Sequence, residues 1–432
     1  MFSVRLIFLI LCIFFNGSLS KLERLDHPVT KSDGSLNILV VGDWGRQGGF
    51  NQSLVAHQMG IVGEQLDIDF VISVGDNFYD DGLKGDTDPA FEASFSHIYT
   101  HPSLQKQWYS VLGNHDYRGN VSAQLSHVLT QKDWRWFCRR SFVLCSGMVE
   151  FFFVDTNPFV EKYFTDPEDH TYDWSNVLPR DKYISNLLHD LDLEMKKSRA
   201  TWKFVVGHHG IKTAGQHGVT QELVDQLLPI LEENKVDLYI NGHDHCLQHI
   251  GSDSEIQFLT SGGGSKAWRG VILPWDPKEL KLYYDGQGFM SLHITHSQTK
   301  FIYYDISSNV LHQSTLSKKS KTFVYDSSKL PQSSRSLHRW RCKIGSQLET
   351  QWKSISGLRL SCGRIRRFKS EARVCARFLW SAGEVEDGRI NSGSAIFGGR
   401  SESHFSGSGS DLVQSVHRLC LASLPLLVWC VL

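Results

Sequence analysis

Residues 37–45 read NILVVGDWG, an apolar run that stops at a glycine followed by an aspartate. Such a run, closed by residues that favour turns, predicts a short buried strand. The pattern recurs at residues 70–79, FVISVGDNFY, and at residues 108–116, WYSVLGNHD, and residues 53–66 have helical character. Strands that alternate with helices in this way predict a parallel sheet with crossover helices.

The chain repeats this pattern further on. Residues 202–209, WKFVVGHH, and residues 236–245, VDLYINGHDH, each end an apolar run in a polar cluster, and residues 220–234 between them have helical character. Further strands are predicted at residues 148–154, 256–260 and 288–306, the last as an antiparallel hairpin. We therefore expect an α/β fold in which two packed sheets, with helices outside them, meet at one site.

Every polar cluster in these motifs lies where a predicted strand ends. In parallel sheets ligands bind beyond the carboxyl ends of the strands, so we expect the clusters to converge there. One Gly-Asp alone is more often a turn. Five clusters together favour a metal centre, because carboxylate and amide oxygens suit a hard cation and imidazoles suit a borderline one. The candidate ligands are Asp43, Asp76, Tyr79, Asn114, His208, His243 and His245.

In order and context, the five motifs resemble those of the purple acid phosphatases, within the metallophosphoesterase superfamily. The resemblance covers residues 37–317 and is closest to the low-molecular-weight plant type, which is similar to tartrate-resistant acid phosphatase. Because Asp43 closely follows the predicted signal peptide, we expect the small form, without the extra N-terminal β domain of the larger plant enzymes. The resemblance implies a four-layer α/β/β/α sandwich of two mixed β-sheets flanked by helices.

The resemblance also implies a role for each candidate ligand. A ferric ion would be bound by Asp43, Tyr79 and His245, and a divalent ion, which is iron, zinc or manganese, by Asn114, His208 and His243. Asp76 would bridge the two ions. Tyr79 is the most discriminating ligand, because a phenolate favours ferric iron and its charge transfer to the metal gives the family its purple colour.

The activity that the resemblance implies is acid phosphatase: hydrolysis of phosphate monoesters by a metal-bound hydroxide at an Fe(III)–M(II) centre. Two adjacent cations lower the pKa of a bound water and hold the attacking and leaving oxygens in line. In the family, residues at the positions of His115, His209 and His217 bind phosphate and help to protonate the leaving group, and a cationic imidazole can do both. Asp116 is expected to orient His115, with a solvated loop carboxylate as the alternative.

Two other functions remain open on the sequence alone. A phosphodiesterase or nucleotide pyrophosphatase of the same superfamily would use the same metals. A secreted glycoprotein that binds iron or phosphate without catalysis would use the same ligands, although the presence of His115 and His217 favours chemistry. The glycine-rich residues 261–266, SGGGSK, predict a flexible turn and not a P-loop, because the strand-to-helix context of that motif is missing.

The N-terminus predicts secretion. Residues 1–20 combine Arg5 with an apolar run at residues 6–15, which is typical of a signal peptide and is shorter than the roughly 20 residues that span a membrane. We expect an extracellular location or a vacuolar-lysosomal lumen, with glycans at Asn51 and Asn120. The expected state is a monomer that acts on small phosphate esters. The formal net charge of -1 argues against a nucleic-acid binder.

The charge balance divides the chain at about residue 320. Residues 21–320 are predicted to form the catalytic domain, and residues 1–320 carry 28 basic and 38 acidic side chains. Residues 321–432 carry 17 basic and 8 acidic side chains and show no clear periodicity. Three explanations compete for this tail: disorder, an error in the gene model, or a GPI signal that ends in the apolar residues 419–432. A membrane is an expected partner only if that signal is real.

Nine cysteines are too few for a disulfide scaffold in a chain of 432 residues. One of them, Cys12, lies in the predicted signal peptide. Cys138 and Cys145 could pair across a short hairpin, although their spacing alone does not establish this.

Overall fold

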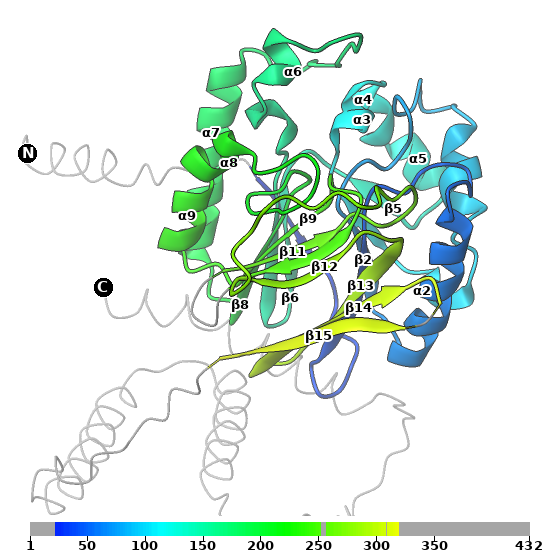
Figure 1. Ribbon diagram of the computed structural model, residues 1–432, viewed down its shortest axis with the longest axis vertical. Helices are drawn as coiled ribbons and strands as arrows, with labels where there is room; N and C mark the ends of the chain where they lie inside the picture. The colour runs from blue at the N-terminus through cyan, green and yellow to red at the C-terminus, as the bar shows by residue number, and fades with distance from the viewer. Residues whose placement is uncertain (1–21, 252–255, 308, 319–432) are drawn as a thin grey trace, which may run out of the picture. The chain divides into compact units, whose positions relative to one another are not determined.

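The computed structural model describes residues 22–251, 256–307 and 309–318, which belong to one compact unit (Figure 1). The predicted signal peptide, residues 1–20, and the predicted tail, residues 321–432, lie outside the described residues. The boundaries of the catalytic domain therefore stay a prediction. In the described part of the chain, no helix has both the length and the apolar character that crossing a bilayer requires.

Two mixed β-sheets form the centre of the fold. The first has the order β1-β6-β7-β8-β9-β11-β10-β12. Its strands, in that order, are Glu23–Asp26, Phe142–Ser146, Val149–Phe153, Trp202–Val206, Leu238–Asn241, Gln257–Ser261, Leu247–Ile250 and Leu280–Tyr284. The second has the order β15-β14-β13-β2-β3-β4-β5. Its strands are Val310–Ser317, Gln298–Asp305, Gly288–Ile294, Leu36–Val41, Phe70–Ser73, Trp108–Ser110 and Trp136–Cys138.

Helices lie on both outer faces of the pair of sheets. The longer ones are α2 (Gln52–Leu66) and α7 (Arg180–Lys197). The shorter α-helices are α3 (Asn114–Tyr117), α4 (Val121–Gln124), α5 (His127–Lys132), α6 (Lys162–Thr165), α8 (Gln221–Gln226) and α9 (Leu228–Glu233). A π-helix, η1 (Glu92–Ser96), and two 3₁₀ helices, η2 (Pro102–Leu104) and η3 (Asn157–Phe159), complete the set of described helices.

Strand β2 shows how the sequence builds the layers. Every residue of β2 is buried, and successive side chains of a strand point to opposite faces. Leu36, Ile38 and Val40 therefore lie in the cluster between the two sheets, whereas Leu39 and Val41 lie in the cluster that contains the buried face of α2. A strand that is covered on both faces needs an unbroken apolar run, which is what residues 38–41 provide.

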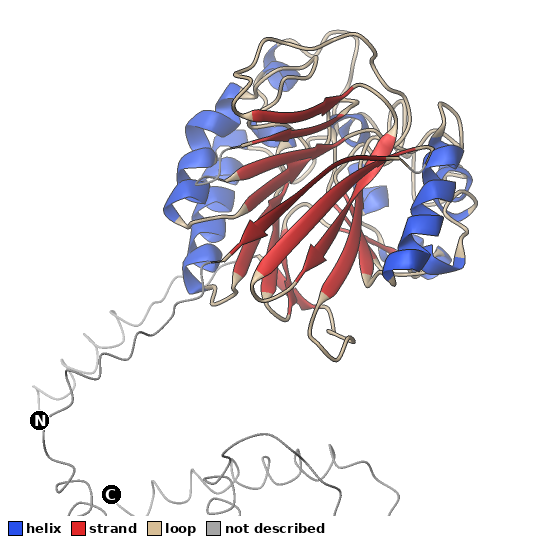
Figure 2. Cartoon of the chain, turned by 60° about the horizontal axis from the view of Figure 1, so that its bottom comes forward, coloured by secondary structure: helices blue, strands red, loops and turns tan. Residues whose placement is uncertain are grey.

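A third apolar cluster covers the outer face of the other sheet. It joins Val205 of β8 and Tyr239 of β9 to Leu187 of α7 and Leu231 of α9. Figure 2 shows the result, with helices on the two outer sides and strands between them. The predicted four-layer α/β/β/α sandwich of two mixed sheets is confirmed, and so is the antiparallel hairpin of β13 and β14.

One local prediction is wrong, and one pairing left open by the sequence is not formed. The helix expected at residues 220–234 is two helices, α8 and α9, because Pro229 in the first turn of α9 has no N–H to continue the hydrogen-bond pattern of α8. Cys138 and Cys145 do not pair. They lie on β5 and β6, which belong to different sheets and are not two arms of one hairpin.

Candidate metal centre

Five strand ends meet where the two sheets lie against each other. Strands β2, β3 and β4 are parallel neighbours in one sheet, and β8 and β9 are parallel neighbours in the other. Between the sheets, the Gly42 N–H donates to the Ser261 carbonyl at 2.8 Å, and Ser261 Oγ donates to the Val40 carbonyl at 2.8 Å. The polar residues after these strands are thus brought together, although 200 positions separate Asp43 from His243.

Asp43, Asp76, Tyr79 and His245 form the first group of candidate ligands. The Tyr79 hydroxyl donates to Asp76 Oδ2 at 2.8 Å and lies 3.0 Å from His245 Nε2 and 3.2 Å from Asp43 Oδ1. Both carboxylates and the imidazole are buried, and their ligand atoms lie within 4.8 Å of one another. Three of the four groups are those expected to bind the ferric ion, and the fourth is the expected bridge.

Asn114, His208 and His243 form the second group. His208 Nε2 lies 3.2 Å from Asn114 Oδ1 and 3.2 Å from His243 Nδ1. Asp76 reaches both groups, since its Oδ1 is 3.5 Å from His208 Nε2 while its Oδ2 accepts the Tyr79 hydrogen bond. The structure therefore places Asp76 where a bridging carboxylate would have to be.

The donor atoms of both groups are spaced as ligands of cations. Metal–ligand bonds of about 2.0–2.2 Å put neighbouring donors of one ion about 3 Å apart. The nearest contacts in the two groups, from 2.8 to 3.2 Å, have this spacing. His208 Nδ1–H donates to the Val74 carbonyl at 2.8 Å, which leaves the lone pair of Nε2 facing the site. The residues present thus fit a pair of metal ions.

The raised pKa values of two candidate ligands support the same conclusion. Burial and the neighbouring Asp76 raise the pKa of Asp43 well above its ordinary value. Burial and the two carboxylates likewise raise the pKa of the Tyr79 phenol. Without cations these groups hold their protons, and a bound metal would displace the protons by stabilising the anions.

The backbone is in the left-handed region at three candidate ligands. The φ angles are 60° at Asp43, 50° at Asp76 and 70° at His243, where few residues other than glycine are found. Two glycines make room beside them: a Cβ on Gly113 would lie 2.1 Å from Asp76 Oδ1, and one on Gly242 would lie 2.4 Å from Asp43 Oδ2. Unfavourable conformations of this kind persist where the surrounding structure holds them, and they cluster at functional sites.

His115 and His217 border the two ligand groups. The His115 ring packs against the Tyr79 ring with centroids 4.4 Å apart, and His115 Nε2 is 3.9 Å from Asp76 Oδ2. His217 is exposed and stacks on the His243 ring, with centroids 3.9 Å apart and an interplanar angle of 18°. The structure therefore brings both predicted catalytic histidines to the ligands, one to each group.

His209, which was predicted with them, has a different environment. Its ring is buried, with Nδ1 2.9 Å from Thr156 Oγ1 and Nε2 3.0 Å from the Tyr163 hydroxyl. Thr156 Oγ1 also accepts the backbone N–H groups of His208 and His209, so its own proton is directed to Nδ1. Nε2 then carries the ring proton and donates to Tyr163. Both ring nitrogens of His209 are therefore engaged, although one of them lies within 4.8 Å of ring nitrogens of His208 and His243.

Asp116 is also placed differently from the expectation. It is fully buried, so the solvated-loop alternative is wrong. Its carboxylate accepts hydrogen bonds from the backbone N–H groups of residues 77, 78 and 113 and from the Gln124 side chain. The contact to residue 113 caps the first turn of α3. The His115 ring instead contacts the Asp80 carbonyl and Arg118, so Asp116 holds the loops that carry Asp76 and Asn114 and not the imidazole itself.

Three residues of the site were missed by the sequence analysis. Asp244 lies between two candidate ligands, but its carboxylate accepts the His217 backbone N–H at 2.9 Å. Trp268 stacks on the His245 ring with centroids 4.0 Å apart and an interplanar angle of 7°. Arg46 lies with Cζ 3.6 Å from the centroid of the Tyr79 ring. Asp244 and Arg46 lie within or beside recognised motifs, and Trp268 closely follows the glycine-rich turn at residues 261–266, so each had a signal nearby in the sequence.

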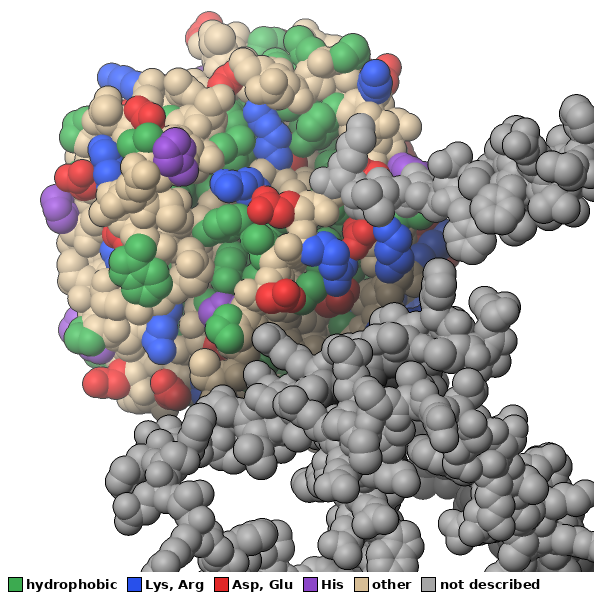
Figure 3. Space-filling model, turned by 180° about the vertical axis from the view of Figure 1, so that it is seen from behind, with side chains coloured by type: hydrophobic (Ala, Val, Ile, Leu, Met, Phe, Trp, Pro, Cys, Tyr) green, Lys and Arg blue, Asp and Glu red, His purple; other side chains and the backbone are tan. Residues whose placement is uncertain are grey.

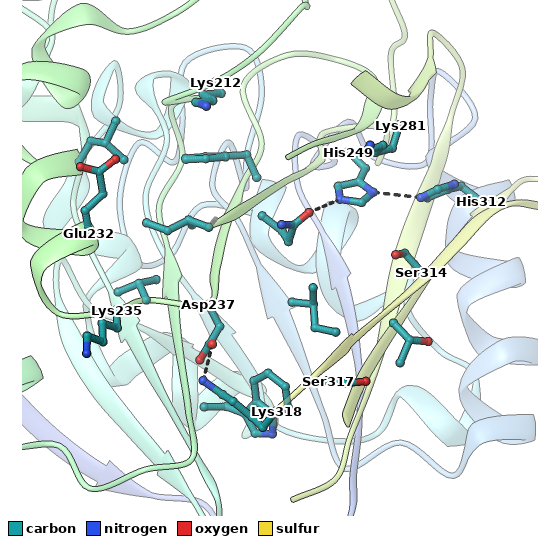
Figure 4. Close-up of a pocket in the computed structure, with 18 residues that line it drawn as sticks. Lys212, Glu232, Lys235, Asp237, His249, Lys281, His312, Ser314, Ser317 and Lys318 are labelled. Atoms are coloured by element: carbon teal, nitrogen blue, oxygen red, sulfur yellow. Dashed lines mark hydrogen bonds and ion pairs between the residues drawn. The ribbon is translucent and has the colours of Figure 1, made fainter. Parts of the chain in front are cut away.

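The structure also has a pocket of about 1010 Å³, drawn in Figure 4. None of the candidate ligands lines it. Inside it His249 lies 3.0 Å from His312, and Lys318 forms an ion pair with Asp237 at 2.5 Å.

The fold is that of the calcineurin-like phosphoesterases. The model of that family matches residues 36–247, a range that contains all seven candidate ligands. A solved structure titled GAP50, the anchor in the inner membrane complex of Plasmodium, has a TM-score of 0.56 and 24% sequence identity, and the match covers 67% of this chain and 90% of that one. This likeness bears on the fold alone.

Comparison with curated relatives identifies a narrower family within the calcineurin-like phosphoesterases. The chain is 86% identical to Purple acid phosphatase 7 of Arabidopsis thaliana over 320 residues, 74% of this chain and 97% of the relative. It is 59% identical to Purple acid phosphatase 17 of the same plant over 72% of this chain and 93% of the relative. Tartrate-resistant acid phosphatase type 5 of Sus scrofa is 28% identical over 71% of this chain and 90% of its own length. The chain belongs to the purple acid phosphatase family, and the resemblance drawn from its five motifs is confirmed.

Proposed function

We propose that this protein is an acid phosphatase that hydrolyses phosphate monoesters at a dinuclear Fe(III)–M(II) centre. Asp43, Tyr79 and His245 would hold the ferric ion, and Asn114, His208 and His243 the divalent ion, with Asp76 between them. The observation that supports this most directly is the convergence of two ligand groups on the two oxygens of Asp76. When bound, the two ions supply an activated water and positive charge for the phosphoryl oxygens.

The residues around the ligands would bind the substrate and move a proton. His115 and His217 lie beside different ligand groups, so a phosphate held there would have an imidazole on either side. A protonated imidazole can donate to a phosphoryl oxygen and then to the leaving oxygen, which prevents release of an unstable alkoxide. Asp244 would hold the His217 loop, and the Thr156–His209–Tyr163 chain would hold His208.

The identity of the metals is tested by metal analysis combined with the visible spectrum of the purified protein. We expect two metal ions per chain, one of them iron, and an absorption band that disappears in Tyr79→Phe while the iron remains. The divalent ion is iron, zinc or manganese, because the nitrogen and oxygen ligands of the second group suit all three. A colourless protein that holds two zinc ions would exclude the ferric assignment.

Turnover separates the candidate reactions. p-Nitrophenyl phosphate should be hydrolysed faster than bis(p-nitrophenyl) phosphate under acid conditions, whereas the opposite order would favour a phosphodiesterase. Metal-replete protein without turnover of either compound at any pH would favour a non-catalytic binding protein. The family membership and the position of His115 and His217 beside the ligands favour the monoesterase.

Location, modification and partners are further parts of the proposal. The predicted signal peptide favours secretion or delivery to a vacuolar-lysosomal lumen, and the exposure of Asn51 and Asn120 is compatible with glycans at both. On the part of the face in Figure 3 that is not covered by grey atoms, acidic and basic side chains are interspersed. We propose a monomer whose partners are small phosphate esters and whose activity survives truncation after Ser320.

A further inference from the structure

Arg46 occupies an enclosed position beside the candidate iron ligands. Its side chain is only 10% exposed, and its Cζ lies 3.6 Å from the centroid of the Tyr79 ring. One guanidinium nitrogen donates to Asp80 Oδ1 at 2.7 Å. Arg46 Nε is buried and has no hydrogen-bond partner among the described residues. A buried N–H without a partner needs an explanation, so we look for an interaction that adds to the ion pair with Asp80.

The contact with Tyr79 supplies that other interaction. The guanidinium lies against one face of the Tyr79 ring, while the His115 ring packs against Tyr79 with centroids 4.4 Å apart. A cation within about 6 Å of a tyrosine ring is attracted to its electrons, and more strongly when both partners are removed from water. The hydroxyl end of the same ring is the part that faces Asp43, Asp76 and His245.

A cation on the ring changes what the phenolate can do as a ligand. Positive charge close to the ring lowers the energy of the electrons that the phenolate shares with a metal, so it weakens the phenolate as a donor. The charge lies closer to the ring than to the metal ligands beyond the hydroxyl, so the donor is affected more than the acceptor. Groups that contact a ligand without touching the metal commonly tune a metal site in this way.

We propose that Arg46 sets the donor strength of Tyr79 toward the ferric ion, and with it the colour and the reduction potential of the centre. This inference rests on the proposed Fe(III)–tyrosinate assignment. Arg46 is a positioning and tuning residue and has no contact with substrate in this role. Its effect is to move the charge-transfer band to shorter wavelength and to raise the reduction potential of the iron.

The negative charge of Asp80 should act on the Tyr79 ring in the direction opposite to the charge of Arg46. Its carboxylate pairs with Arg46 at 2.7 Å, but its side chain is 75% exposed, so water screens it. Removal of this negative charge leaves the cation over Tyr79 less neutralised. Substitutions at Arg46 and at Asp80 should therefore shift the same band in opposite directions, with the smaller shift at Asp80.

The test uses the full chain loaded with iron and measures iron content, the wavelength of the visible maximum and the reduction potential. Arg46→Met, which keeps the length of the side chain and removes its charge, should shift the maximum to longer wavelength and lower the potential. Arg46→Lys should change the wavelength and the potential less than Arg46→Met does. Asp80→Asn should change the wavelength and the potential in the opposite direction. Lys266→Met is the matched control, because that cation lies 5.7 Å from the Phe50 ring centroid and has no ring contact with Tyr79.

The possible outcomes separate this inference from the proposed function. A wild-type protein without iron or without a visible band would refute the ferric assignment itself. A wild-type band that stays at the same wavelength in Arg46→Met and Asp80→Asn would refute the role of Arg46 and leave the assignment intact. An equal shift in Lys266→Met would also refute it, because the effect would then come from net charge alone. If Arg46→Met fails to fold, the opposite shifts of Arg46→Lys and Asp80→Asn decide the question.

Discussion

The Asp244 carboxylate accepts the backbone N–H of His217 at 2.9 Å, so a residue that lies between two candidate ligands in the chain points to a loop and not to the metal site. Thr213 Oγ1 donates to the same carboxylate. A Cβ added to Gly215 would lie 2.2 Å from Asp244 Cγ, which shows how closely this loop is packed on the carboxylate.

Asp244→Asn should lower kcat and leave the metal content unchanged. The amide keeps the shape of the carboxylate, but it loses the charge that strengthens the bond to the His217 backbone. A hydrogen bond to a charged group contributes about 1.5–3 kcal/mol, which corresponds to a loss of about 10- to 100-fold in kcat if the loop position is needed in the transition state. Asp237→Asn is the control, because that carboxylate accepts the Lys203 backbone N–H in the pocket that none of the candidate ligands line. Equal losses of kcat in both variants would contradict the positioning role.

Substitutions of the three predicted catalytic histidines should differ in their effects on kcat and on the free energy of unfolding. His115→Gln and His217→Gln should each lower kcat by roughly 10²- to 10⁴-fold, the usual contribution of a general acid or base, with the fold unchanged. His209→Gln should mainly lower the free energy of unfolding, by about 1–3 kcal/mol, because it leaves buried hydroxyls of Thr156 and Tyr163 without their partner. Denaturant unfolding and steady-state kinetics on the three variants measure both effects. A larger kcat loss in His209→Gln than in His217→Gln would show that His209 contacts the substrate after all.

The ligand set could be predicted because its signal is local. An apolar run followed by Gly and a polar residue marks the end of a buried strand, and neighbouring parallel strands deliver their ends to one place. Asp116 could not be interpreted in this way. Its neighbours in sequence suggested a partner for His115, whereas its actual partners are backbone N–H groups of residues 77, 78 and 113, and these become neighbours only when β3 and β4 pair.

The same reason explains the other failures. The residues from Cys138 to Cys145 look like a hairpin, but the chain moves from one sheet to the other between β5 and β6, and short sequence patterns do not contain that step. Trp268 and the Arg46 contact depend on loops that approach the site from opposite sheets. Only the folded chain shows which side chain covers which ring.

Protonation of the buried His249 ring should lower the stability of the fold in acid. Its buried ring lies 3.0 Å from His312 and 2.9 Å from Gln257 Oε1 (Figure 4), and burial, with the charges of His312 and Lys281 nearby, lowers its pKa to about 4. The unfolded chain binds the proton near pH 6.5, whereas the folded chain does not until about pH 4. The contribution of neutral His249 to the free energy of unfolding is therefore fully present above pH 6.5. It decreases as the pH drops toward 4, by at most about 3 kcal/mol.

His249→Gln tests this pH dependence. The variant has no titratable group at this position, so its unfolding free energy should fall less between pH 6.5 and pH 4 than that of the wild type. Denaturant unfolding at both pH values measures the difference. His189→Gln makes the same substitution at an exposed position on α7 and is the control for the change of side chain itself. An unchanged slope in His249→Gln would contradict the assignment.

Removal of the metals should destabilise the protein more at neutral pH than in acid. Burial beside Asp76 raises the pKa of Asp43 in the folded apo-protein. Protonated Asp43 therefore stabilises the folded apo-protein in acid, and this stabilisation is lost as the pH rises through the raised pKa. Bound cations remove the penalty on the ionised form. The difference in Tm between metal-loaded and chelator-treated protein should thus be larger at pH 7 than at pH 5, and Asp43→Asn should reduce the pH dependence of the apo-protein. Equal differences at both pH values would contradict the buried-charge explanation.

Neither sheet contains a complete set of ligands for either ion. Asp43, Asp76, Tyr79 and Asn114 follow strands of one sheet, and His208, His243 and His245 follow strands of the other. Each cation would thus be a cross-link between two halves of the molecule that are otherwise joined mainly by apolar packing. Heating that separates the halves would release both ions together, so inactivation, bleaching and unfolding should be a single event with a single rate.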